Sequence, residues 1–170
     1  MKNNIENKPH VKIKQQQRMK PDWLKTQIPG EGHYAEMLKL VKDNKLHTIC
    51  ESGSCPNMGE CWGEGTATFM ILGNVCTRSC GFCGVQTGKP EPVDMFEPGR
   101  VANSVKIMGV KHAVITSVDR DDLKDGGSEI WAQTVRAIRQ QSPGTTLETL
   151  IPDFAGFWDN LQVIIDVAPE

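Results

Sequence analysis

The chain has 170 residues, 38% of them hydrophobic, and its 19 basic and 21 acidic side chains give a formal net charge of -2. This length and composition are typical of one soluble globular domain. The charge balance argues against a nucleic-acid partner, because proteins that bind nucleic acid usually present an overall basic surface to the phosphates. The longest apolar run, around residues 69–72, is far shorter than the roughly 18 residues of a membrane-spanning helix, so no membrane partner is expected.

The first 30 residues are rich in lysine and lack the apolar core of an export signal. They contain one arginine, no serine and two acidic residues, a composition that fits an organellar transit peptide poorly. We therefore expect residues 1–30 to form a solvated, partly disordered tail. The cysteines are expected to stay reduced, in a cytoplasmic protein.

The next segment combines a helical pattern with a cysteine-rich stretch. Glycine, serine, proline, asparagine and three cysteines dominate residues 50–65, which predicts a loop wrapped around a metal centre in place of a hydrophobic core. The preceding residues predict a short amphipathic helix, because apolar side chains and one lysine stem recur at helical spacing: Tyr34, Met37, Leu38, Val41 and Lys45.

Three apolar runs alternate with helical stripes through the rest of the chain. Strands are predicted at residues 67–72, 112–117 and 145–150. Each is followed by a helix, and the second helix has Ser128 as its expected N-cap. The helical stripes consist of Val101, Val105 and Met108, then Ile130, Thr134, Val135 and Ile138, then Trp158, Leu161, Ile164 and Ile165. Such alternation predicts an α/β fold with parallel strands and right-handed crossovers.

Three strand–helix units cannot close an eight-stranded barrel, which takes roughly 250 residues. We therefore expect a partial (βα) TIM-barrel-like fold with about three βα units and an N-terminal cysteine-rich extension, as a fragment or truncation of a longer protein. The expected organisation is a tail over residues 1–30, a helix and cluster-binding loop over 31–65, and the partial barrel over 66–170.

Cys76, Cys80 and Cys83 follow the first predicted strand, at the strand end where parallel α/β folds place their chemistry. Three thiolates can hold three irons of a four-iron, four-sulfur cube and leave the last iron open to a ligand. An electron carrier of the ferredoxin type would show four cysteines per cluster. A structural zinc site would favour paired Cys-x2-Cys motifs or added histidines, and this segment contains one such pair.

Cys50, Cys55 and Cys61 form an earlier triplet with Cys-x4-Cys-x5-Cys spacing, which no common zinc module uses. By itself this spacing indicates only a second site with three thiol ligands.

The second triplet, with an aromatic residue before its last cysteine, closely resembles the cluster loop of radical S-adenosylmethionine (SAM) enzymes. The two triplets in this order resemble the lipoyl synthase family, and the resemblance covers most of the chain after about residue 20. The segments that carry it are Pro21-Asp-Trp-Leu, Cys55-Pro-Asn-Met-Gly-Glu-Cys-Trp62, Gly88-Lys-Pro90, Thr116-Ser-Val-Asp-Arg-Asp-Asp-Leu123, Asp125-Gly-Gly127 and Glu148-Thr-Leu-Ile-Pro-Asp-Phe154.

The resemblance implies a radical SAM fold and a sulfurtransferase that inserts two sulfur atoms into the octanoyl chain of an octanoylated lipoyl carrier protein. Cys76, Cys80 and Cys83 would then be catalytic and hold one [4Fe-4S] cluster, whose open iron binds the amino and carboxylate groups of SAM. The triplet at 50, 55 and 61 would hold an auxiliary [4Fe-4S] cluster that donates sulfur. The implied partners are the glycine cleavage H protein or a 2-oxoacid dehydrogenase as carrier, and ferredoxin or flavodoxin as electron donor.

Polar residues after the second and third predicted strands are candidates for binding the ammonium and ribose groups of SAM. They are Thr116, Ser117 and Asp119 and, at the end of the third strand, Glu148. The alternative is a solvated polar loop. Arg120 is expected to meet an acidic carrier protein.

The family pattern also has parts that this sequence lacks. The fourth ligand of the family's auxiliary cluster is a serine in an Arg-Ser-Ser-Tyr motif, which is absent here, so the 170 residues alone are expected to be inactive. A radical SAM enzyme of the biotin synthase type and a non-catalytic iron–sulfur or zinc-binding fragment are the alternatives. The four histidines lack metal-like spacing, and His112 is expected to pack at the start of a strand. Trp62 is expected to anchor the core or to shield the auxiliary cluster.

Overall fold

The computed structural model describes Pro21 and residues 33–167. The expected tail lies outside the described residues, apart from Pro21. A four-stranded sheet forms the centre, in the order β1-β2-β5-β6. The strands are β1 (His47–Thr48), β2 (Thr66–Ile71), β5 (His112–Ser117) and β6 (Thr146–Leu150). The pairs β2–β5 and β5–β6 are parallel, and β1 is antiparallel to β2.

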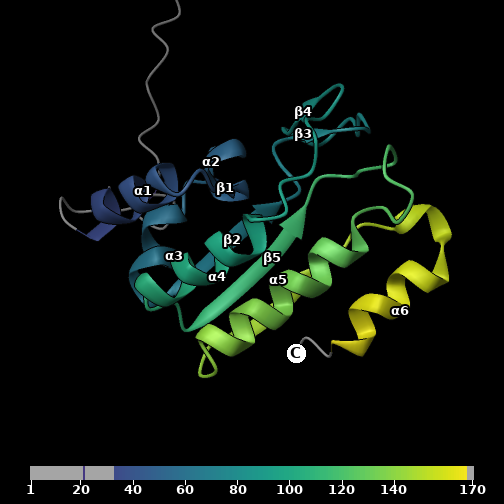
Figure 1. The fold of residues 1–170 in the computed structure, drawn as a ribbon. Coiled ribbons are helices and arrows are strands. Elements are labelled where there is room, and N and C mark those ends of the chain that lie inside the picture. The colour runs from purple at the N-terminus through teal and green to yellow at the C-terminus, as the bar shows by residue number, and fades with distance from the viewer. Residues whose placement is uncertain (1–20, 22–32, 168–170) are drawn as a thin grey trace, which may run out of the picture.

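Helices cover one face of this sheet and one of its edges. In Figure 1, α4 and α5 lie side by side across one face, α6 lies beyond α5, and α1, α2 and α3 gather at the β1 edge. A small parallel pair, β3 with β4, projects beyond the end of β5 toward which that strand points. The remaining elements are α1 (His33–Asp43), α2 (Ile49–Ser52), α3 (Met58–Glu64), β3 (Val75–Cys76), β4 (Gln86–Thr87), α4 (Glu97–Ile107), α5 (Ser128–Gln141), a 3-10 turn (Phe154–Gly156) and α6 (Trp158–Asp166).

The predicted α/β alternation is confirmed, with each long strand within a residue of its predicted position. Alternate side chains of β2 and β5 are buried against the helices, because successive residues of a strand point to opposite faces. Ser117 marks the helical face, since its hydroxyl accepts a hydrogen bond from the Trp131 indole of α5 at 3.2 Å. The buried side chains form one hydrophobic cluster, which includes Ala67, Phe69, Ile71, Ala113, Ile115, Val101, Val105, Val135 and Ile138.

The opposite face of the sheet is polar along β5 and β6. Thr146 and Glu148 are exposed there. His112 begins β5, as expected, and packs against two residues of β6. Its side chain points to the open face, where Nδ1 lies 2.7 Å from the Thr146 hydroxyl and Nε2 lies 3.3 Å from the Glu148 carboxylate.

The prediction of a continuous loop over residues 50–65 is wrong, because two short helices form there. Trp62 on α3 is only 1% exposed and belongs to the hydrophobic cluster, so a core does organise this segment. Gly65 ends α3 with a φ of 90°, a left-handed conformation that glycine adopts without steric cost.

Two predicted helix ends also differ from the structure. Lys45 was placed on the first helix, but α1 ends at Asp43 and Lys45 has a φ of 51°. The N-cap position of α5 is held by Gly127 in place of Ser128. The Asp125 carboxylate accepts hydrogen bonds from the backbone N–H groups of Gly127 and Glu129, and so supplies the acceptor expected from serine. In the part of the chain that the structure describes, no helix is long and apolar enough to cross a membrane.

Candidate metal centre

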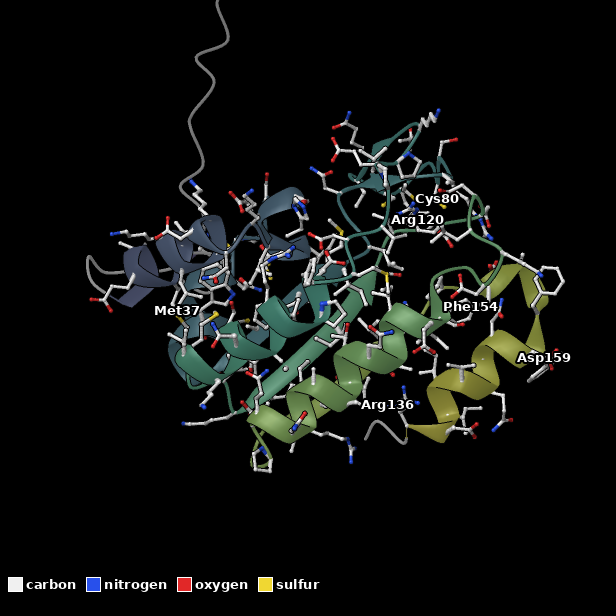
Figure 2. The ribbon with its side chains drawn as sticks, viewed as in Figure 1. Met37, Cys80, Arg120, Arg136, Phe154 and Asp159 are labelled. Atoms are coloured by element: carbon white, nitrogen blue, oxygen red, sulfur yellow. The ribbon has the colours of Figure 1, made fainter. Side chains whose placement is uncertain are left out.

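The second cysteine triplet lies where the parallel strands end. Cys76 closes β3 and is 9% exposed, whereas Cys80 and Cys83 are exposed to solvent. Figure 2 shows Cys80 above the end of β5, in the small lobe that β3, β4 and the loop between them form. All six cysteines are free thiols. The position at the C-terminal ends of the strands agrees with the place where parallel α/β folds carry their chemistry.

Backbone groups hold the Cys76 sulfur in place. The N–H groups of Asp119 and Arg78 donate to Sγ at 3.3 and 3.4 Å, and the Cys76 carbonyl accepts from Gly88 N–H at 3.0 Å. The thiol itself donates to Asp119 Oδ2 at 3.8 Å. These contacts fix the position of one of the three sulfurs of the triplet.

An ion-pair network connects the second triplet to two strand ends. Arg78 donates from Nε and Nη2 to the two carboxylate oxygens of Asp121, at 2.8 and 2.6 Å, and from Nη1 to Asp153 at 2.8 Å. The guanidinium lowers the pKa of both carboxyls, and these carboxylates raise the pKa of Arg78. The sequence reasoning missed Arg78, Asp121 and Asp153. The available signal was an arginine inside the cysteine motif and acidic residues after two predicted strands.

The first triplet comes from the helical segment before β2. Cys50 lies on α2, Cys55 follows it in a turn, and Cys61 lies on α3, all of them half-buried. Burial raises the pKa of the Cys50 thiol, Cys55 and Cys61 raise it further, and hydrogen bonds with Thr68 oppose the rise. The three cysteines thus belong to one short helical segment that packs against β2.

The two triplets approach each other through their backbones. A Cβ placed on Gly84, next to Cys83, would lie 3.9 Å from the carbonyl oxygen of Ser52, which stands between Cys50 and Cys55. Within residues 33–167, no three histidine, cysteine or acidic side chains converge closely enough to hold a single metal ion. An iron–sulfur cube binds each thiolate to a different iron, so its ligands do not need to converge on one point.

The other predicted site residues lie in different environments. Asp119 is beside Cys76, and its Oδ1 is 3.7 Å from Arg78 Nη1. Thr116 donates from Oγ1 to the Leu150 carbonyl at 3.2 Å, whereas Ser117 is on the helical face. Glu148 was expected at the end of its strand, but it occupies the middle of β6, opposite Val114 in register and close to His112.

The expectation that Arg120 meets an acidic carrier is wrong, because its side chain is buried. Arg120 is 4% exposed and lies beneath the lobe that carries Cys80 (Figure 2). Its guanidinium donates to the carbonyls of Leu72 and Glu91 and to both carboxylate oxygens of Asp122. These contacts tie the end of β2 to the loop after β5 and leave no guanidinium surface for a partner.

Comparisons with known proteins all point to one family. A model of the N-terminal domain of lipoyl synthase of the radical SAM family matches residues 1–55. The mitochondrial lipoyl synthase of Nematostella vectensis is 70% identical over 151 residues, which cover 89% of this chain and 52% of that protein. The lipoyl synthase of Christiangramia forsetii is 66% identical over 160 residues, or 94% of this chain and 55% of that protein. The chain thus spans about half the length of the curated relatives it matches.

Proposed function

We propose that this chain belongs to the lipoyl synthase family, and that it acts in the radical SAM-dependent insertion of two sulfur atoms into an octanoyl chain on a lipoyl carrier protein. One observation carries the proposal. Cys76, which begins the second triplet, lies beside Asp119 at the C-terminal end of β5, and the backbone next to Cys83 comes close to Ser52, between two cysteines of the first triplet.

The residues present fit a four-iron cluster at the second triplet. The cluster needs thiolates, and Cys76 offers a sulfur that already accepts two backbone N–H groups. Cys80 and Cys83 are exposed, so iron and sulfide can reach them. With SAM on its open iron, the cluster would supply the one-electron chemistry that an unactivated C–H bond requires.

Polar side chains near the strand ends would hold SAM. Thr116 and Asp119 are the best placed of the proposed contacts, since both belong to the C-terminal end of β5 or the loop after it. Ser117 and Glu148 remain proposed contacts, although each already has an internal partner. The task of these residues would be to orient the sulfonium compound and to exclude water from it.

The first triplet would hold the auxiliary [4Fe-4S] cluster that gives up its sulfur. In this proposal the tail comprises residues 1–30, residues 31–65 form the unit that binds the auxiliary cluster, and residues 66–170 form the partial barrel. The carrier would be an octanoylated glycine cleavage H protein or the lipoyl-bearing component of a 2-oxoacid dehydrogenase, and ferredoxin or flavodoxin would supply electrons. We propose the cytoplasm as the compartment, because thiols that are to hold iron–sulfur clusters need a reducing environment.

Metal analysis of anaerobically purified protein tests this function. About eight irons per chain are expected for two cubes, with matching acid-labile sulfide and little zinc. Changing Cys76, Cys80 and Cys83 to serine should remove about half of the iron, and the matched triple change at Cys50, Cys55 and Cys61 should remove the other half. In the second of these variants, the electron paramagnetic resonance signal of the reduced cluster should change when SAM is added. A signal that SAM leaves unaltered, or zinc in place of iron, would contradict the proposal and favour a non-catalytic metal module.

A further inference from the structure

Little apolar packing holds the loop that carries the second triplet. Residues 79–84 are all exposed, and the Phe82 ring, which lies between two of the cysteines, is 95% exposed. A loop without buried side chains keeps one conformation only if polar contacts fix it. The β3–β4 pair holds the base of this loop, and polar contacts at its start attach it to the rest of the molecule.

Two adjacent residues, Thr77 and Arg78, supply these contacts. Thr77 donates from N and from Oγ1 to the carbonyl oxygen of Asp119, at 3.1 and 3.0 Å. Arg78 adds the bidentate pair with Asp121 after β5 and the contact with Asp153 after β6. One side chain thus joins the cysteine loop to two neighbouring strand ends, 43 and 75 residues away along the chain.

The geometry suits arginine and not lysine. A planar guanidinium can meet one carboxylate with two parallel N–H groups while a further N–H reaches a second carboxylate, whereas an ammonium group is a single point charge. An isolated surface ion pair contributes little, but a bidentate pair within a network of several charges contributes more. The Arg78 side chain is 30% exposed, whereas Asp121 and Asp153 are exposed, so the network lies at the surface and its strength depends on its geometry.

We propose that Arg78 is a positioning residue that fixes loop 76–83 against the ends of β5 and β6 before any cluster is bound. The link to cluster assembly rests on the proposed function. A loop that is already ordered loses less conformational entropy when its thiolates take up iron. Without Arg78, the loop should open and expose Cys76, which is now buried.

Alkylation of single cysteines in the full, metal-free chain tests this role. The rate at which iodoacetamide modifies Cys76 would be followed by mass spectrometry. Arg78→Gln should raise this rate roughly fivefold to thirtyfold, Asp153→Asn should raise it less, and Arg78→Lys should give an intermediate rate. Arg136→Gln is the matched control, because Arg136 is an exposed arginine on α5, away from the lobe (Figure 2).

Rates at other cysteines separate positioning from a general loss of the fold. Cys76 is buried, so a faster reaction in Arg78→Gln reports that its sulfur has become accessible. Rates at Cys50 and Cys61 in the same sample report the rest of the fold. A Cys76 rate in Arg78→Gln equal to wild type would overturn the proposal. So would equal acceleration at Cys50 and Cys61, because Arg78 would then support the fold in general.

Iron loading gives a second readout. Arg78→Gln should lower the iron retained by the second triplet and leave the share of the first triplet unchanged, whereas unchanged loading would count against the proposal. A chain that binds no iron at all would refute the proposed function, and the alkylation result would still decide the role of Arg78.

Discussion

Replacing Gly127 by alanine should destabilise the fold at the point where β2 leads into the cysteine loop. Gly127 has a φ of 86°, and a Cβ added there would overlap Leu72 Cδ1 and lie 3.0 Å from Cδ2. Leu72 is 3% exposed, and its own backbone is held by Glu97 Oε2 at N–H and by Arg120 Nη1 at the carbonyl. Leu72 therefore has little freedom to move away.

Two costs add to give the magnitude. A non-glycine residue in the left-handed region costs roughly 1–2 kcal/mol, and overpacking of a buried site costs roughly 1–3 kcal/mol. We therefore expect Gly127→Ala to lower the free energy of unfolding by about 2–5 kcal/mol. The value should lie in the lower half of this range if the Leu72 side chain can rotate.

Urea unfolding followed by circular dichroism measures the effect. Gly144→Ala is the matched control, because no atom lies within 4 Å of its added Cβ, and it should change stability by less than about 1 kcal/mol. Leu72→Ala in the Gly127→Ala background should relieve the overlap, so the double variant should lose less than the sum of the single losses. If the free energy of unfolding of Gly127→Ala matches that of wild type within about 0.5 kcal/mol, the contact with Leu72 is not the reason why this position requires glycine.

Three further substitutions test the interior. Burial raises the pKa of the Glu97 carboxyl above its ordinary 4.5, so the folded state keeps this proton to higher pH than the unfolded state, and the free energy of unfolding falls as pH rises through that window. In urea titrations from pH 4 to 7, Glu97→Gln should therefore become more stable relative to wild type as pH rises, and parallel curves would contradict this. Arg120→Ala should lower the free energy of unfolding by about 2–4 kcal/mol, because it leaves buried carbonyl groups without a donor. Unchanged stability together with weaker carrier binding would instead support a role for Arg120 in binding the carrier. Trp62→Ala should cost about 3–5 kcal/mol in thermal unfolding, and a small loss would show that the α3 segment has no real core.

The fold could be predicted from the sequence where burial follows a period. In β2 and β5 one face is covered by helices, so Phe69, Ile71 and Ile115 are apolar at every second position. The cysteine-rich segment could not be predicted in this way, because its helices are one or two turns long and a single buried Trp62 organises α3. The two-residue strands β1, β3 and β4 are too short for any period to show.

The candidate site was predictable only where spacing encodes chemistry. Six cysteines carry their ligand pattern in their spacing, so both triplets could be named in advance. Arg78 and Arg120 carry no such pattern, because what each does depends on chain-distant acceptors. Arg78 meets carboxylates on the outside, and Arg120 meets backbone carbonyls in the interior. Two arginines that look alike in sequence thus have different roles.

The outer edge of β6 bears on how the sheet can grow. In the described residues β6 is the last strand of the sheet, and one side of its backbone is paired with β5. Leu150 and Ile151 stand exposed at its end. An uncovered edge of this kind offers N–H and carbonyl groups to any extended peptide, including a neighbouring copy. We expect this edge to be where a further strand or an extended peptide would add to the sheet.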